Sequence, residues 1–178
     1  MGRPKGGIVH DERTLAARAA SQLAPVCSEV VIGVAPGAEN PAPEWPAVED
    51  APPAGRGPLA GIDAAFTAFV GRDLLVLACD YPRIDTPLLR ALVARAAGTD
   101  DDLVVLEDGS GRVHPLVGVW RHAAATAVRE TVRAGSLRVA DLLDRVRAAR
   151  LGPRELPEID LDRALVNWNR PEDIGPEG

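Results

Sequence analysis

One stretch of the chain limits the fold more than any other. Residues 73–80 read Asp-Leu-Leu-Val-Leu-Ala-Cys-Asp, an unbroken apolar run between two carboxylates. A run without alternating polar side chains is typical of a parallel strand that is buried on both faces. Such a strand needs helices packed over both faces of its sheet. The run therefore predicts an α/β fold, with Asp80 at the carboxyl end of the strand.

Helix-like and strand-like patterns alternate along the rest of the chain. Apolar spacing and capping residues predict helices over residues 12–23, 59–69, 87–97 (capped by Thr86), 121–133 and 137–149, and a last helix from residue 171. Apolar runs predict further strands over residues 29–34, 103–106, 113–120 and 164–166. Residues 35–57, rich in Pro, Gly and Ala, are expected to form an irregular connection.

Together these elements predict a mostly parallel sheet covered on both faces. The turn at residues 108–111 makes residues 103–106 and 113–120 a hairpin, which adds one mixed element. A length of 178 residues suits a single domain spanning 1–178.

Charge and hydropathy exclude several classes of protein. Twenty Lys and Arg against 26 Asp and Glu give a net charge of −6, which argues against a nucleic-acid partner. No segment approaches the roughly 18 apolar residues of a membrane span. Residues 1–7 are not followed by the apolar region of a signal peptide, so a cytoplasmic location is expected. Two cysteines, Cys27 and Cys79, make neither a disulfide scaffold nor a metal-binding spacing.

Two features point to a phosphate-binding site. Ligands of open α/β sheets bind beyond the carboxyl ends of the strands, where Asp80 could hold Mg²⁺ together with substrate phosphates. The alternative is an Asp that only begins a turn before Pro82. Residues 55–61 form a glycine-bearing loop running into a helix, whose amides could bind an anion. The alternative there is a plain junction between loop and helix.

Other polar residues are ambiguous when taken alone. Lys5 could place a charge on a phosphate, although a lysine so near the start of the sequence is more often a solvated charge. Asn167 and Asn169 could cap a final helix or reach a nucleotide or metal at the sheet edge. The three histidines, His10, His114 and His122, have no metal-cluster spacing.

The ordered set of motifs is more specific than any member. In chain order it comprises Met1-Gly2-Arg3-Pro4-Lys5, Glu49-Asp50, Gly57-Pro58-Leu59-Ala60-Gly61, Ala78-Cys79-Asp80-Tyr81-Pro82, His114-Pro115-Leu116, Gly135-Ser136-Leu137-Arg138-Val139 and Val166-Asn167-Trp168-Asn169-Arg170-Pro171-Glu172-Asp173. This set resembles the molybdenum cofactor guanylyltransferase family, nucleotidyltransferases with a three-layer Rossmann-like fold.

The resemblance implies a reaction and a set of roles. The phosphate of molybdenum-carrying molybdopterin would attack the α-phosphorus of GTP, releasing pyrophosphate and forming a guanine dinucleotide cofactor. Lys5 and Asp80 would be catalytic, with Asp80 holding Mg²⁺. The nucleotide would lie near Lys5, Asp50, Gly57, Pro58, Leu59 and Gly61, and the substrate phosphate near His114, Arg138, Asn167 and Asn169. Partner proteins would be those that insert molybdenum, or the molybdoenzymes that receive the product.

The chain departs from the family pattern at its start. The family opens with a buried strand and a Gly-rich loop, and this sequence begins inside that loop. Either translation starts upstream of Met1 or nucleotidyl transfer has been lost, and the full set of downstream residues favours the first. Rival functions are transfer of another nucleotide such as CMP, transfer to a sugar phosphate, or a non-catalytic relative that binds pterin or a partner protein.

Overall fold

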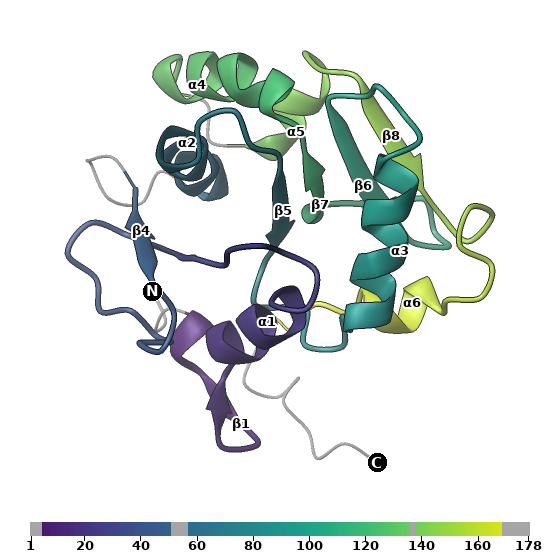
Figure 1. Cartoon of the computed structure of the whole chain (residues 1–178). Coiled ribbons are helices and arrows are strands. Elements are labelled where there is room, and N and C mark those ends of the chain that lie inside the picture. Colours follow the sequence, from purple (N-terminus) through teal and green to yellow (C-terminus); the bar gives the residue numbers. More distant parts are fainter. Residues whose placement is uncertain (1–4, 51–56, 136–137, 169–178) are drawn as a thin grey trace.

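A four-stranded sheet forms the centre of the molecule (Figure 1). The computed structural model describes residues 5–50, 57–135 and 138–168. The strands stand in the order β5 (Leu74–Leu77), β7 (Val113–Trp120), β6 (Leu103–Glu107) and β8 (Ala148–Leu151). β7 is antiparallel to both of its neighbours, and β8 is parallel to β6. Three of these strands, β5, β6 and β8, therefore run the same way, and their carboxyl ends share one edge.

Helices cover both faces of this sheet. One core lies between the sheet and α1 (Leu15–Leu23), α3 (Thr86–Ala96) and the short α6 (Leu161–Ala164). A second core lies on the other face, under α2 (Pro58–Ala68), α4 (Ala125–Arg133) and α5 (Val139–Leu143). The predicted three-layer α/β architecture is confirmed. None of the helices among the described residues has the length and apolar character needed to cross a membrane.

A second, smaller sheet stands beside β5. It pairs β3 (Ile32–Val34) with β4 (Ala47–Glu49) in parallel, and no ladder joins it to the larger sheet within the described residues. Two single-turn 3₁₀ helices, η1 (Lys5–Gly7) and η2 (His122–Ala124), and a short hairpin of β1 (Val9–His10) and β2 (Arg13–Thr14) complete the elements.

Several predicted elements need correction. Residues 148–151 form β8 rather than the end of a helix, because pairing with the free edge of β6 outweighs the helical propensity of Ala and Arg. β4 lies inside the connection that was expected to be irregular, because pairing with β3 holds its three residues in an extended conformation. Residues 164–166 are not a strand, because α6 continues through Ala164.

Helix starts also differ from the prediction. Asp85, rather than Thr86, caps α3 by accepting the amide of Leu88 at 2.9 Å. The Thr86 hydroxyl instead donates to the Gln22 carbonyl, which ties α3 to α1. α1 begins at Leu15 because Thr14 caps it, after a turn with positive φ at residues 11 and 12. The predicted helix from residue 171 lies outside the described residues.

Candidate active site

An ion pair marks the carboxyl end of β5. Asp80 follows the strand by three residues, and its Oδ2 lies 3.0 Å from the Nζ atom of Lys5, a residue 75 positions away in the sequence. The Asp80 side chain is 17% exposed and the Lys5 side chain is 38% exposed, so the ion pair is partly buried. The structure thus brings together the two residues that the sequence singled out as catalytic.

The end of the described chain also contacts Asp80. The backbone amide of Trp168 donates to the Asp80 carbonyl at 2.9 Å. The Trp168 ring is buried and meets His10 edge-to-face, with 4.9 Å between ring centroids. Residues from both ends of the described chain therefore converge on Asp80.

Two oxygen atoms at this point are buried without a hydrogen-bond partner. They are Oδ1 of Asp80 and Oδ1 of Asn167, and within the described residues neither accepts a hydrogen bond. Buried polar atoms are nearly always satisfied, so unsatisfied acceptors indicate a missing cation or donor. Carboxylate and amide oxygens are ligands that Mg²⁺ accepts. The orphaned oxygens therefore fit a magnesium ion.

Asp80 brings a carboxylate to this point. No group of three or more His, Cys, Asp or Glu that could hold a metal occurs among the described residues. Mg²⁺ commonly binds through one or two carboxylates, with waters and substrate phosphates completing its octahedron. The donor set thus suits a metal that arrives with a phosphate substrate rather than a permanently caged ion.

A buried chain of hydrogen bonds positions Tyr81, which sequence reasoning did not single out. Its hydroxyl lies 3.1 Å from His114 Nδ1, and His114 Nε2 lies 3.0 Å from Asp108 Oδ2. His114 is 2% exposed, and both of its ring nitrogens are engaged. Burial raises the pKa of Tyr81, and a hydrogen bond with Asn167 opposes that rise. His114 therefore lies behind Tyr81 and orients it, and Tyr81 in turn contacts Asn167.

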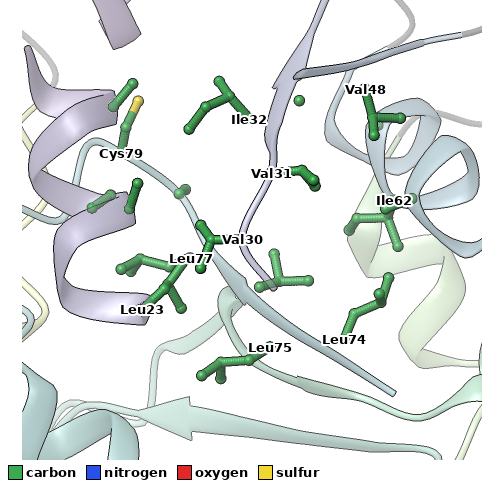
Figure 2. A pocket seen from close by; sticks show the side chains of 18 of the residues that line it. Leu23, Val30, Val31, Ile32, Val48, Ile62, Leu74, Leu75, Leu77 and Cys79 are labelled. Carbon is green, nitrogen blue, oxygen red and sulfur yellow. The ribbon is translucent and has the colours of Figure 1, made fainter. Parts of the chain in front are cut away.

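The first turn of α2 lines a pocket that also reaches Gly6 and Cys79, the sequence neighbours of Lys5 and Asp80 (Figure 2). Gly57 caps the helix with φ +69°, a conformation that favours glycine, and Pro58 occupies the first turn. A Cβ atom on Gly61 would lie 3.1 Å from Oδ1 of Asp50, so this carboxylate rests against the helix. Partial burial raises the pKa of Asp50. Leu59 is fully buried in the core, so its side chain anchors the turn instead of facing a ligand.

Of the other predicted residues, one lies apart from this group and one lies outside the described residues. Arg138 is the N-cap of α5, and no contact in the described part of the chain joins it to Lys5 or Asp80. Asn169 lies outside the described residues, as do Met1 to Pro4.

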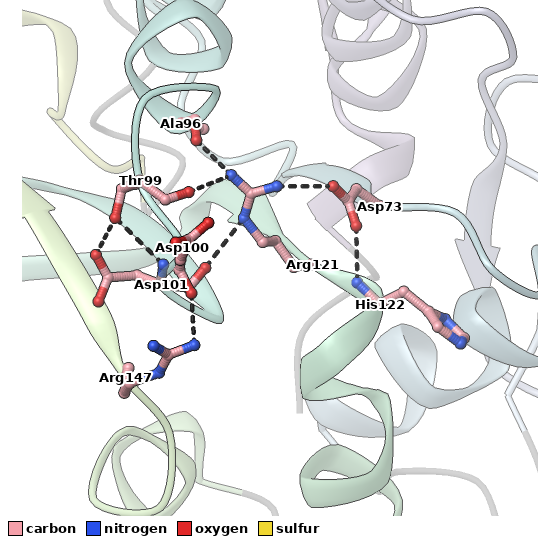
Figure 3. Close-up of polar contacts among 8 residues, drawn as sticks. All are labelled: Asp73, Ala96, Thr99, Asp100, Asp101, Arg121, His122 and Arg147. Carbon is pink, nitrogen blue, oxygen red and sulfur yellow. Dashed lines mark hydrogen bonds and ion pairs between the residues drawn. The ribbon is translucent and has the colours of Figure 1, made fainter.

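The opposite end of β5 carries a different polar cluster (Figure 3). Asp73 accepts the backbone amide of His122 at 2.8 Å and Nη1 of Arg121 at 3.3 Å. The same guanidinium donates to the carbonyls of Ala96 and Thr99, at the end of α3. The cluster joins the ends of helix and strand, and its role is structural.

Comparison with known proteins shows which family the chain resembles. The MobA-like NTP transferase domain model matches residues 1–149. A molybdenum cofactor guanylyltransferase of Cereibacter sphaeroides is 30% identical over 177 residues, covering 97% of this chain and 86% of that protein. A probable molybdenum cofactor guanylyltransferase of Chloroflexus aggregans is 32% identical over 164 residues, covering 88% and 76%.

The chain belongs to the MobA-like NTP transferase domain family.

Solved structures show the same fold. Molybdopterin-guanine dinucleotide biosynthesis protein A of Archaeoglobus fulgidus superposes with a TM-score of 0.78 at 20% identity, over 96% of this chain and 86% of that one. A 2-C-methyl-D-erythritol 4-phosphate cytidylyltransferase of Thermus thermophilus gives a TM-score of 0.70 at 19% identity, over 96% and 90%. As a MobA-like NTP transferase domain, the protein is a nucleotidyltransferase, which confirms the predicted enzyme class and its Rossmann-like fold.

Proposed function

We propose that this protein transfers GMP from GTP to the phosphate of molybdopterin carrying molybdenum, releasing pyrophosphate. The observation that carries the proposal is the pairing of Lys5 with Asp80 beside two orphaned buried oxygens. Relatives that align with up to 97% of this chain, at 30% identity, are named molybdenum cofactor guanylyltransferases, which supports the choice of substrates.

Asp80 and Asn167 would hold Mg²⁺ through the oxygens that lack a hydrogen-bond partner. Bound there, Mg²⁺ would supply positive charge that offsets the negative charge developing during transfer. Lys5 would turn from Asp80 to the triphosphate, which needs no more than a rotation of its flexible side chain. Preorganised charges of this kind supply most of the catalysis in phosphoryl-type transfer, and no side-chain nucleophile is needed.

Asp50 is the group best suited to select guanine. Guanine presents two adjacent N–H donors on its pairing edge, and a carboxylate can accept both. Asp50 is half-buried against the first turn of α2, where Gly61 leaves room for its carboxylate. Cytosine and adenine each present a single amino donor beside an acceptor nitrogen, and that nitrogen would face the carboxylate unfavourably.

Asp50→Asn tests the nucleotide choice directly. The assay measures nucleotide transfer to molybdopterin with Mg²⁺ and either GTP or CTP, with pyrophosphate release as a second readout. We expect the unchanged protein to prefer GTP, and the variant to lose that preference more than it loses turnover. Equal turnover with GTP and CTP by the unchanged protein would contradict the guanylyl assignment.

A further inference from the structure

A line of hydrogen bonds leads from the turn between β6 and β7 to the candidate magnesium site. Oδ2 of Asp108 lies 3.0 Å from Nε2 of His114, and Nδ1 of His114 lies 3.1 Å from the hydroxyl of Tyr81. Tyr81 also hydrogen-bonds Asn167, whose Oδ1 is one of the two orphaned oxygens. Tyr81 and His114 are both buried, so the middle of the line is sheltered from water. The line therefore joins a turn at the surface to a proposed metal ligand.

Asp108 can only accept a hydrogen bond in this line. Hydrogen bonds from Ser110, and to a lesser extent from His114, hold the pKa of Asp108 well below its ordinary value, so its side chain is a carboxylate. A carboxylate has no hydrogen to donate. Nε2 of His114 therefore carries a hydrogen and donates it to Oδ2 of Asp108.

The other end of the line fixes the direction of the Tyr81 hydroxyl. Burial raises the pKa of Tyr81, and the hydrogen bond with Asn167 opposes that rise, as expected when an amide nitrogen donates to the phenol oxygen. Oδ1 of Asn167 has no partner within the described residues, which agrees with this orientation of the amide. The hydroxyl of Tyr81 must then donate to Nδ1 of His114, the acceptor that the described part of the chain offers it. His114 is thus held as the tautomer with its hydrogen on Nε2.

These directions determine which atom of Asn167 is left for a ligand. An asparagine amide fits equally well either way round, with its oxygen and nitrogen exchanged. The phenol oxygen of Tyr81, whose hydrogen is given to His114, can only accept from Asn167 and so selects the amide nitrogen. We propose that Asp108 is a positioning residue: through His114 and Tyr81 it keeps the carbonyl oxygen of Asn167, rather than the amide nitrogen, available to a cation beside Asp80. This inference rests on the proposed function, because it takes Asn167 as a ligand of Mg²⁺.

A purely structural role for Asp108 is the alternative, because the same carboxylate holds the turn. Its Oδ1 accepts the backbone amides of Ser110 and Arg112 at 2.9 and 3.0 Å, and the Ser110 hydroxyl at 2.6 Å. These bonds use Oδ1, whereas the line to the site begins at Oδ2. The two roles belong to different atoms, so a substitution can separate them.

Asp108→Asn reverses the line while it keeps the shape of the side chain. Two backbone amides face the position of Oδ1, so the oxygen of the new amide should take that position and its nitrogen should face His114. An amide nitrogen donates, so Nε2 of His114 must accept and the ring hydrogen moves to Nδ1. Nδ1 then donates to the phenol oxygen of Tyr81, and the Tyr81 hydroxyl donates to the carbonyl of Asn167. The carbonyl oxygen is thereby withdrawn from the site.

NMR spectroscopy of the protein without nucleotide or metal reports this reversal. The chain has three histidines, and a long-range proton–nitrogen spectrum shows which ring nitrogen of His114 carries the hydrogen. We expect Nε2 in the unchanged protein and Nδ1 in Asp108→Asn. Tyr81 is the one tyrosine of the sequence, so proton–proton contacts between its ring and the side-chain amide of Asn167 can be assigned, and they should weaken in the variant.

Ser110→Ala is the matched control for the turn. It removes a hydrogen bond to Oδ1 of Asp108 and leaves Oδ2 facing His114. The turn should therefore loosen while the tautomer of His114 and the contacts of Asn167 stay as they are.

Transfer of GMP gives a second readout, which separates metal binding from turnover. Loss of an outer group that orients a metal ligand weakens metal binding by about 10–100-fold, so the Mg²⁺ concentration for half-maximal transfer by Asp108→Asn should rise by about that factor. Turnover at saturating Mg²⁺ should fall much less, and Ser110→Ala should change neither quantity. Tyr81→Phe cuts the line at its middle, so it should raise the Mg²⁺ requirement while Asp108 still holds the hydrogen of His114 on Nε2.

Several results would overturn the proposal. One is a hydrogen that stays on Nε2 of His114 in Asp108→Asn, and another is unchanged contact between Asn167 and the ring of Tyr81. An equal rise in the Mg²⁺ requirement of Ser110→Ala would also overturn it, because stability of the turn would then explain both variants. If the unchanged protein transfers no GMP, the proposed function fails, whereas reversal of the His114 tautomer and of the Asn167 contacts would still support the orientation of Asn167 by Asp108.

Discussion

Asp80→Asn separates the proposed catalytic role of this carboxylate from its structural one. The substitution keeps the shape of the side chain and removes the charge that Lys5 meets at 3.0 Å. Because the Lys5 side chain is 38% exposed, water screens the pair, and its contribution to the free energy of unfolding is about 1 kcal/mol or less. For a domain of this size, that loss lowers the melting temperature by about 2–4 °C.

The expected loss of activity is much larger. The proposed magnesium ion loses its one carboxylate ligand, and removing a single electrostatic stabiliser of a transition state lowers turnover by about 10²–10³. The assay combines a thermal melt with transfer of GMP to molybdopterin.

Asp73→Asn is the matched control, because Asp73 stands at the other end of the same strand and pairs with Arg121, as Asp80 pairs with Lys5. The carboxylate of Asp73 accepts the backbone amide of His122, and its ion pair with Arg121 is similarly exposed, so the melting temperature should fall by a comparable amount. Transfer by Asp73→Asn should stay within about twofold of the unchanged protein. If Asp80→Asn loses no more activity than Asp73→Asn, the assignment of Asp80 as a metal ligand is wrong.

Three further predictions concern ligand choice, packing and pH. With Mg²⁺ present, GTP should raise the melting temperature of the protein more than CTP or ATP, because a ligand stabilises the folded state by RT ln(1 + [L]/Kd). Equal shifts would argue against guanine selection. Gly118→Ala should lower the free energy of unfolding by about 1–3 kcal/mol, because its Cβ would lie 2.7 Å from the Val104 carbonyl oxygen, and an unchanged urea midpoint would refute that packing argument. Hydrogen bonds from Ser110, and to a lesser extent from His114, hold the pKa of Asp108 well below 3.8. The contribution of Asp108 to the free energy of unfolding is therefore complete above pH 3.8, and it is lost as the pH falls through the pKa of Asp108 in the folded protein. Acid titration of Asp108→Asn should show a flatter decline in stability below pH ~4 than the unchanged protein, and parallel curves would exclude this contribution.

Local patterns predicted the parts of the fold that local physics determines. The hairpin of β6 and β7 follows from two apolar runs around the turn at residues 108–111, and α2 follows from Pro58 and regularly spaced apolar residues. β4 and β8 were missed because each is short and is stabilised by a neighbouring strand rather than by its own composition.

The candidate site shows the same division. The position of Asp80 at a strand end was readable from the sequence, but its pairing with Lys5 spans 75 residues and only the resemblance to a family suggested it. The role of His114 behind Tyr81 could not be read at all, because it depends on β7 lying beside β5. The one available signal was the Asp-Gly turn, which places Asp108 near the start of β7.

The convergence of Lys5 and Trp168 on Asp80 has a consequence for biosynthesis. During translation, Lys5 and Asp80 leave the ribosome long before residue 168 is added, so a nascent chain can pair β7 with β5 and β6 while Asn167 and Trp168 are still unmade. Of the two acceptor oxygens at the candidate site, that of Asn167 is therefore added last. A chain that stops shortly before residue 167 should fold its central strands but bind nucleotide with Mg²⁺ more weakly than the 178-residue chain.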